Sequence, residues 1–127
     1  GKLGDAWVLV DRAEQAAIAY QRAAAVRSND MGIIETAAAW HAKAAGQWDA
    51  LGQAEKALLQ WRQAQARQAQ VAAKFPGDAD VQKILQKYKR QVQAHNLARV
   101  NRAHSSNEKS LRRVVVSGDR PAANRAK

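Results

Sequence analysis

Two stretches of this chain share one pattern of small and aromatic residues, offset by 41 positions. In each, an aromatic residue comes four positions after one alanine and three before the next. The two sets are Ala16, Tyr20 and Ala23, and Ala57, Trp61 and Ala64. At 3.6 residues per turn, this spacing puts the three side chains of a set on one helical face. The alanines let a neighbouring helix approach closely and the ring fills the remaining gap, so we expect an array of repeated helical units.

The likeness continues upstream of each copy at matching offsets. Before the first copy stand Leu3, Gly4, Trp7, Val10 and Asp11, and before the second stand Ala44, Ala45, Trp48, Leu51 and Gly52. Over about residues 1–92 the chain resembles the tetratricopeptide repeat, in a long-period bacterial variant. That family has small residues and an aromatic ring in a first helix, a glycine at the turn, and alanine, ring and alanine in a second helix.

The chain departs from the family pattern at two places. Ala44 and Ala45 replace the expected leucine and glycine, and Ser28-Asn29-Asp30 stands where the first copy should close with a proline. A generic array of helical hairpins is therefore the alternative interpretation. Under either interpretation the fold class is all-α, with antiparallel hairpins. The resemblance implies a short α-solenoid of about two and a half repeats, followed by a basic, extended C-terminal tail.

Turn residues and apolar spacing set the expected boundaries. We expect helices at residues 2–10, 12–27, 31–47 and 53–74, and a fifth helix that begins at residue 79 and ends at residue 92 or at residue 102. Gly52 and Pro76-Gly77 mark turns, and Asp30 (or Asn29) and Asp78 stand where helix caps belong. We expect a repeat domain over residues 1–95 and a tail over 96–127 that is irregular or ordered only on a partner. The repeat core is expected to contain Trp7, Ala16, Tyr20, Ala23, Trp48, Ala57, Trp61 and Ala64.

The net charge of +10 lies entirely in the last third of the chain. Residues 1–82 hold nine basic and nine acidic residues, whereas residues 83–127 hold twelve basic residues against Glu108 and Asp119. Such asymmetry is typical of a segment that meets an acidic partner, whether protein, nucleic acid or membrane surface. A solvated tail that only aids solubility is the alternative.

No arrangement of residues suggests catalysis or a cofactor. The sequence has no phosphate-binding loop and no nucleophile elbow, and no cysteine that could bind zinc or act as a thiolate. His104 beside Ser105 lies in a segment expected to be irregular, and His41 is expected to be a partly exposed helix residue. Asp78 and Asp80 are explained as a cap and a first-turn acid. We therefore expect neither an enzyme nor a metal or cofactor site.

The resemblance implies a partner-binding concave face formed by the first helix of each repeat. Its exposed candidates are Asp5, Glu35, Lys43, Gln47, Lys83 and Lys87. The lysine, arginine and asparagine clamp with which some family members hold a peptide carboxylate is not reproduced, because Gly1, Asp5 and Gly46 stand at such positions. A chaperone-tail ligand is therefore disfavoured.

Two functions follow as hypotheses. The first is a non-enzymatic scaffold or adaptor that binds protein, as a subunit or fragment of a larger assembly. The alternative is an RNA-binding accessory subunit. In both, the tail would meet its acidic partner through Arg99, Arg102, Arg112, Arg113, Arg120 and Arg125. No aromatic residue follows Tyr88, which disfavours base-specific recognition of single strands.

The compartment is expected to be the cytoplasm or another reducing, soluble one. The chain has no cysteine for a disulfide, no run of 18 uncharged apolar residues and no secretory leader. Gly1 stands where an initiator methionine would, so the chain is either processed or a piece of a longer one.

Overall fold

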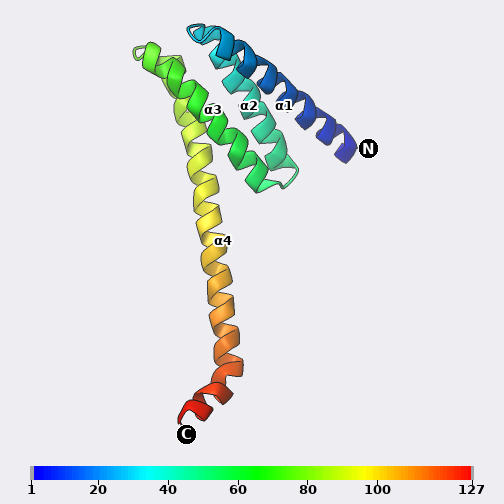
Figure 1. Cartoon of the computed structure of the whole chain (residues 1–127), viewed down its shortest axis with the longest axis vertical. Coiled ribbons are helices and arrows are strands. Elements are labelled where there is room, and N and C mark those ends of the chain that lie inside the picture. Colours follow the sequence, from blue (N-terminus) through cyan, green and yellow to red (C-terminus); the bar gives the residue numbers. More distant parts are fainter. Residues whose placement is uncertain (1, 127) are drawn as a thin grey trace. The chain divides into compact units, whose positions relative to one another are not determined.

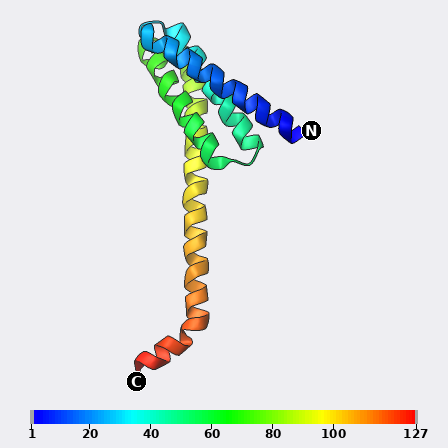
Figure 2. The ribbon, with the colours of Figure 1, turned by 45° about the vertical axis from the view of Figure 1, so that its right-hand side comes forward.

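The computed structural model describes residues 2–126, with the side chains of residues 4–106. The described residues form four helices and no strand: α1 (Lys2–Val26), α2 (Met31–Ala50), α3 (Ala54–Lys74) and α4 (Ala79–Ala126). The all-α prediction is therefore confirmed. The chain divides into a unit of Gly1–His95 and a unit of Asn96–Lys127. In the first unit α1, α2 and α3 lie side by side in alternating directions (Figure 1), and a second view shows the same order (Figure 2).

Short polar residues cap two of these helices, as predicted. The Asp30 carboxylate accepts a hydrogen bond from the Ile33 amide at 3.1 Å and begins α2. Asp78 accepts from the amides of Asp80 (3.1 Å) and Val81 (3.2 Å) and begins α4. Each carboxylate satisfies amides that have no partner within the helix and also favours the positive end of its dipole. These caps hold α2 and α4 in register after the two turns that precede them.

The turn between α2 and α3 depends on Gly52. Its φ of +74° lies in the left-handed region, the only positive φ among the residues described. Glycine adopts this conformation freely, whereas a Cβ there is strained. The turn that the sequence predicts at this glycine is confirmed.

Two glycine-to-alanine changes six residues apart should therefore have opposite effects. Gly52→Ala is expected to lower the free energy of unfolding by about 1 kcal/mol, because alanine resists positive φ. Gly46→Ala is expected to raise it by about 0.5–1 kcal/mol, because Gly46 is an exposed residue inside α2 and a Cβ there meets nothing within 4 Å. Urea unfolding followed by circular dichroism measures both. Effects of the same sign would contradict the described turn.

The predicted break in the first helix is wrong. Residues 2–10 and 12–27 were expected to be separate helices, but α1 runs without interruption from Lys2 to Val26. Asp11 stands at the position that Gly52 occupies in the second copy, and no glycine or proline lies between Asp5 and Val26. Nothing in this stretch therefore stops the helix. The first copy is an open, continuous helix where the second is a hairpin.

The two copies consequently have different surroundings. Trp61 is 6% exposed, whereas Tyr20 is 39% exposed. Ala57 and Ala64 are buried, but Ala16 and Ala23 are only half-buried. The repeat pattern predicts equivalent surroundings for Tyr20 and Trp61, but the two rings lie in different surroundings.

The core of the first unit is built from small residues and a few large rings. One cluster contains Val10, Ala38, Ala45, Trp48, Ala57, Trp61, Ala64 and Tyr88. A second contains Ile34, Val71, Ala72, Val81 and Leu85. The alanines let the helix axes lie close together, and the large rings of Trp48, Trp61 and Tyr88 fill the space between them. Both clusters include residues of α4 between Val81 and Tyr88, so the start of α4 is fixed against α2 and α3.

In the second unit, which the sequence predicts to be irregular or ordered only on a partner, the backbone is helical to Ala126. Residues 97–117 contain no glycine or proline, and alanine, leucine, arginine and lysine favour helix. Residues 114–116 are three valines, which favour strands, yet they lie within α4. The polar composition of this stretch is compatible with a solvated helix.

Candidate interaction surface

Some of the residues predicted for the concave face are exposed, and others are half-buried between helices. Asp5 on α1, Lys43 on α2, and Lys83 and Lys87 on α4 are exposed. Lys83 and Lys87 are four residues apart and therefore lie on one face of α4. The Lys43 ammonium also lies 5.0 Å from the centre of the Trp40 ring, which partly covers it.

Glu35 and Gln47 are half-buried and belong to the packing between helices. A Glu35 oxygen accepts a hydrogen bond from the Gln68 amide at 3.4 Å, and Gln68 also donates to the Val81 carbonyl at 3.2 Å. Burial raises the pKa of Tyr88, and the Glu35 carboxylate raises it further. The Gln47 amide oxygen is buried and has no hydrogen-bond partner among the described residues. Glu35 is therefore connected through Gln68 to α3 and to the start of α4.

The predicted tail residues lie in the second unit. Arg99 and Arg102 are exposed on α4. The other four predicted arginines, Arg112, Arg113, Arg120 and Arg125, lie outside the residues whose side chains are described. Their role in binding an acidic partner stays a prediction.

A chain of polar contacts connects α1, α2 and α3 of the first unit. Glu14 on α1 accepts from the Trp48 indole at 2.8 Å and from the Gln60 amide at 3.1 Å. Because Gln60 presents its NH₂ group to this carboxylate, its oxygen faces His41 Nδ1 at 2.7 Å. His41 Nδ1 must therefore carry the proton and donate, which leaves Nε2 as an unprotonated atom. His41, Gln60, Glu14 and Trp48 are called the Glu14 network below.

His41 is buried, with only 5% of its surface exposed, so the prediction of a partly exposed residue is wrong. Its Nε2 has no partner among the described residues. Burial lowers the pKa of His41; the Gln60 hydrogen bond and the Glu14 charge oppose this shift, and the Arg67 charge adds to it. Seven-residue spacing was the available signal, because Ile34, His41 and Trp48 share one face of α2 and all three are buried.

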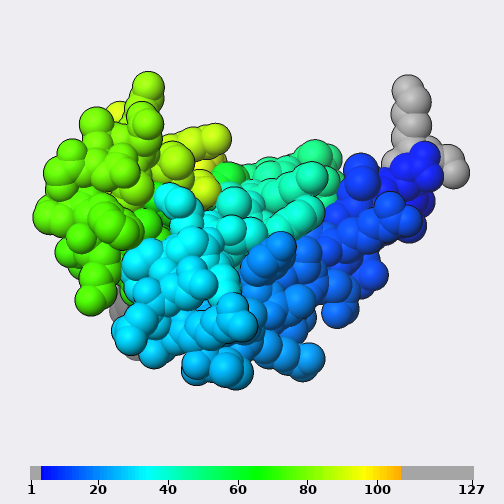
Figure 3. Space-filling view, turned by 90° about the horizontal axis from the view of Figure 1, so that it is seen from above, coloured from blue at the N-terminus to red at the C-terminus, as the bar shows by residue number. Residues whose placement is uncertain are grey.

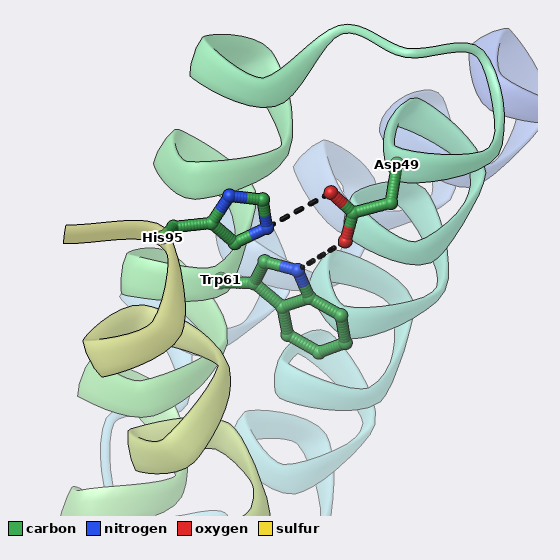
Figure 4. Close-up of polar contacts among 3 residues, drawn as sticks. All are labelled: Asp49, Trp61 and His95. Carbon is green, nitrogen blue, oxygen red and sulfur yellow. Dashed lines mark hydrogen bonds and ion pairs between the residues drawn. The ribbon is translucent and has the colours of Figure 1, made fainter. Parts of the chain in front are cut away.

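A second polar contact joins α2, α3 and α4 (Figure 4). The Asp49 carboxylate points toward both of its partners: one oxygen lies 2.8 Å from His95 Nε2, and the other accepts from the Trp61 indole at 2.9 Å. Asp49 is the penultimate residue of α2, and His95 is the last residue of the first unit. The contact lies at the edge of the core cluster that contains Trp61 and Tyr88, where it satisfies the Trp61 indole N–H.

Removing the Asp49 carboxylate should therefore weaken the contacts among three helices. Asp49→Ala is expected to lower the free energy of unfolding by about 1 kcal/mol, since it removes the acceptor of a buried indole N–H at a partly exposed site. Asp11→Ala, a change to an exposed carboxylate on α1, is the matched control and should cost less than about 0.5 kcal/mol. Equal losses in urea unfolding would contradict this role of Asp49.

Trp7 reaches the core edge through the ring of Trp48. The two rings meet edge to face, with centroids 5.1 Å apart and planes at 80°. The Lys56 ammonium lies 4.6 Å from the centre of Trp48 and 5.7 Å from the centre of Trp7. Trp7 is nevertheless 38% exposed, so its predicted core position is only partly reached. This arrangement tethers the first half of α1 to α2 and α3.

The described residues include no cluster of three histidine, cysteine or acidic side chains placed to hold a metal ion. Within the same residues, no helix combines the length and apolar character that crossing a bilayer requires. Comparison with known proteins gave no matching family model, no matching curated protein and no matching solved structure. The function is therefore argued from the residues themselves.

Proposed function

We propose that this chain is a non-enzymatic scaffold module that binds an acidic segment of a protein partner within a larger assembly. The observation that carries the proposal is the two-sided character of α4 over residues 79–95. Val81, Leu85 and Tyr88 anchor one face of this stretch in the core. Lys83, Lys87 and Arg90 are exposed on another. A row of cations on an anchored helix suits an acidic partner, because the backbone that carries them is already ordered before binding and their charges attract the partner.

The hairpin of α2 and α3 supports a repeat architecture for this module. We infer that it is one unit of a tetratricopeptide-like array. Six of the positions that match between the two copies are buried in this one, Leu51 is half-buried, and Gly52 lies at the turn. The six buried positions are Ala44, Ala45, Trp48, Ala57, Trp61 and Ala64. Arrays of this kind bind partners across the faces of successive helices.

The proposal is tested with a fluorescent glutamate-rich peptide and the full chain. Binding followed by fluorescence anisotropy at low salt should weaken several-fold in the double variant Lys83→Ala, Lys87→Ala. Arg22→Ala, which removes an exposed cation from α1, is the matched control and should leave binding unchanged. Absence of peptide binding at low salt, or equal loss in the control, would count against the proposed surface.

RNA is the second candidate, because six of the twelve basic residues after position 82 are arginines beyond His95. Arginine suits bidentate phosphate contacts, and six contacts to single-stranded RNA predict a slope of roughly −4 in log affinity against log salt. A uridine homopolymer that binds more tightly than the acidic peptide, with such a slope, would favour this function over the first. The absence of aromatic residues after Tyr88 predicts little base preference.

A further inference from the structure

We propose that two copies of this chain associate through α1, in antiparallel orientation about a two-fold axis at Ala16. The surface concerned is a row of seven residues along α1, called the α1 row: Asp5, Leu9, Arg12, Ala16, Tyr20, Ala23 and Arg27. The proposal does not depend on α4 or on its acidic partner. It rests on exposure, on the symmetry of the row and on the placement of its charges.

The α1 row is a largely exposed face of an edge helix, in which apolar residues lie between charged ones. α1 buries Val10, Ala13 and Ala17 within the unit, and the row lies about a quarter of a turn away from them. Leu9 is 48% exposed and Tyr20 is 39% exposed, while Ala16 and Ala23 are half-buried. α1 forms one side of the unit, in blue, and the turn between α3 and α4 lies on the opposite side, in green (Figure 3). The Leu9 and Tyr20 side chains are therefore accessible to a second helix that lies along the row.

The row reads the same from both ends. Successive members are 4, 3, 4, 4, 3 and 4 residues apart, so the spacing is palindromic about Ala16. The mean step of about 3.7 residues keeps the row nearly straight along the helix over about 33 Å. Arg27 follows the last helical residue, but its amide still donates to the Ala23 carbonyl at 2.9 Å, so it continues the row. An antiparallel second copy therefore meets every member with another member.

The pairs that result are complementary. Asp5 of one copy meets Arg27 of the other, Arg12 meets Tyr20, and Leu9 meets Ala23, each twice. Ala16 meets its own symmetry mate, where the small side chain allows the closest approach of the helices. Two cation–aromatic pairs and two opposite-charge pairs stabilise this arrangement. A parallel copy would instead place Asp5 against Asp5 and Arg27 against Arg27, so the charges select the antiparallel dimer.

One helix pair of this length is smaller than a standard protein interface. We therefore expect reversible association in the micromolar range rather than a permanent dimer. Sedimentation equilibrium of the full chain over a concentration series should show a monomer–dimer equilibrium. A chain that stays monomeric up to millimolar concentration would overturn the proposal. It would then be another helical segment or another protein that covers the α1 row.

Charge reversal identifies the pairing. Asp5→Arg and Arg27→Asp should each weaken association roughly tenfold or more, because each replaces two attractive pairs by two repulsive ones. An equimolar mixture of the two variants should form a heterodimer, and the double variant should regain association, since both restore opposite charges. Arg22→Asp, an exposed change outside the row, is the control and should have no such effect. Circular dichroism checks that the variants keep their helix content.

Two outcomes contradict the pairing even if the chain dimerises. Association that is insensitive to both single reversals would place the interface elsewhere. Failure of the mixed variants to associate, with each alone still folded, would show that Asp5 and Arg27 do not meet. A bulky charge at the axis gives an independent check, because Ala16→Glu should abolish association by placing two carboxylates together.

Discussion

Trp61→Ala is expected to lower the free energy of unfolding by about 3–5 kcal/mol, whereas Tyr20→Ala should cost less than about 1 kcal/mol. The two residues hold the same place in the repeated sequence pattern but differ in burial, 6% against 39% exposed. The Trp61 ring packs against Tyr88 at a centroid distance of 6.1 Å, and its indole donates to Asp49. Removing it leaves a cavity where four helices meet, while removing the Tyr20 ring leaves a surface already open to water.

Urea unfolding followed by far-ultraviolet circular dichroism measures both losses, at a concentration where the chain is monomeric. Trp61→Phe is the companion variant if Trp61→Ala does not fold. It keeps most of the ring and removes the donor to Asp49, so it should cost about 1–2 kcal/mol. Equal losses at Tyr20 and Trp61 would mean that the first copy forms the closed hairpin predicted from the repeat, and not the continuous α1.

The helices of the second copy could be predicted because the residues that begin and end them act locally. Gly52 needs a positive φ, and Pro76-Gly77 and Asp78 end one helix and begin the next within a few residues. Each of these signals acts through the backbone of its own residue and not through distant contacts. The helices on either side then follow from apolar spacing, which also identified Ala57, Trp61 and Ala64 as core.

The helix break predicted for the first copy is wrong because the likeness to the family lies in the side chains, whereas a break depends on the backbone. Trp7, Ala16 and Tyr20 fit the repeat, but Asp11 replaces the glycine that would break the helix. A side chain with no need for positive φ leaves the helix free to continue, and helix formation favours continuation once begun. Side-chain spacing indicated which residues could pack, whereas the backbone at a single position decided whether they would.

The polar contacts could not be predicted from the sequence. Glu14 lies 34 residues from Trp48 and 46 from Gln60, and no periodic pattern relates residues at such separations. His41 carried a weak signal in its seven-residue spacing to Ile34 and Trp48, but its polarity argued for the surface. Burying a histidine requires a partner, and that partner becomes visible only when α1, α2 and α3 are packed together.

The Glu14 network predicts that stability falls as the medium becomes acidic, and that His41→Gln removes part of this dependence. Burial lowers the pKa of His41 in the folded chain below its ordinary value of about 6.5. As the pH falls through the ordinary value, the histidine of the unfolded chain takes up its proton before that of the folded chain. Protonation therefore favours unfolding. The slope from His41 is positive below about pH 6.5 and cannot exceed about 1.4 kcal/mol per pH unit, the limit for one proton.

The geometry gives the reason for the sign. His41 Nδ1 already donates to Gln60, so a second proton must sit on Nε2, which is buried with no acceptor among the described residues. The cation would also face Arg67 across the helices, and the charge of Glu14 only partly offsets this. His41→Gln keeps a donor for Gln60 and cannot be protonated, so the variant should lose less stability than the wild type between pH 7 and pH 5.

The measurement compares urea unfolding of the wild type and His41→Gln at several pH values. All other ionisable groups are the same in the two proteins, so only the difference between the two curves is attributed to His41. Parallel curves for wild type and His41→Gln would mean that the imidazole is as accessible to protons in the folded chain as in the unfolded one, which is incompatible with its position between α1, α2 and α3.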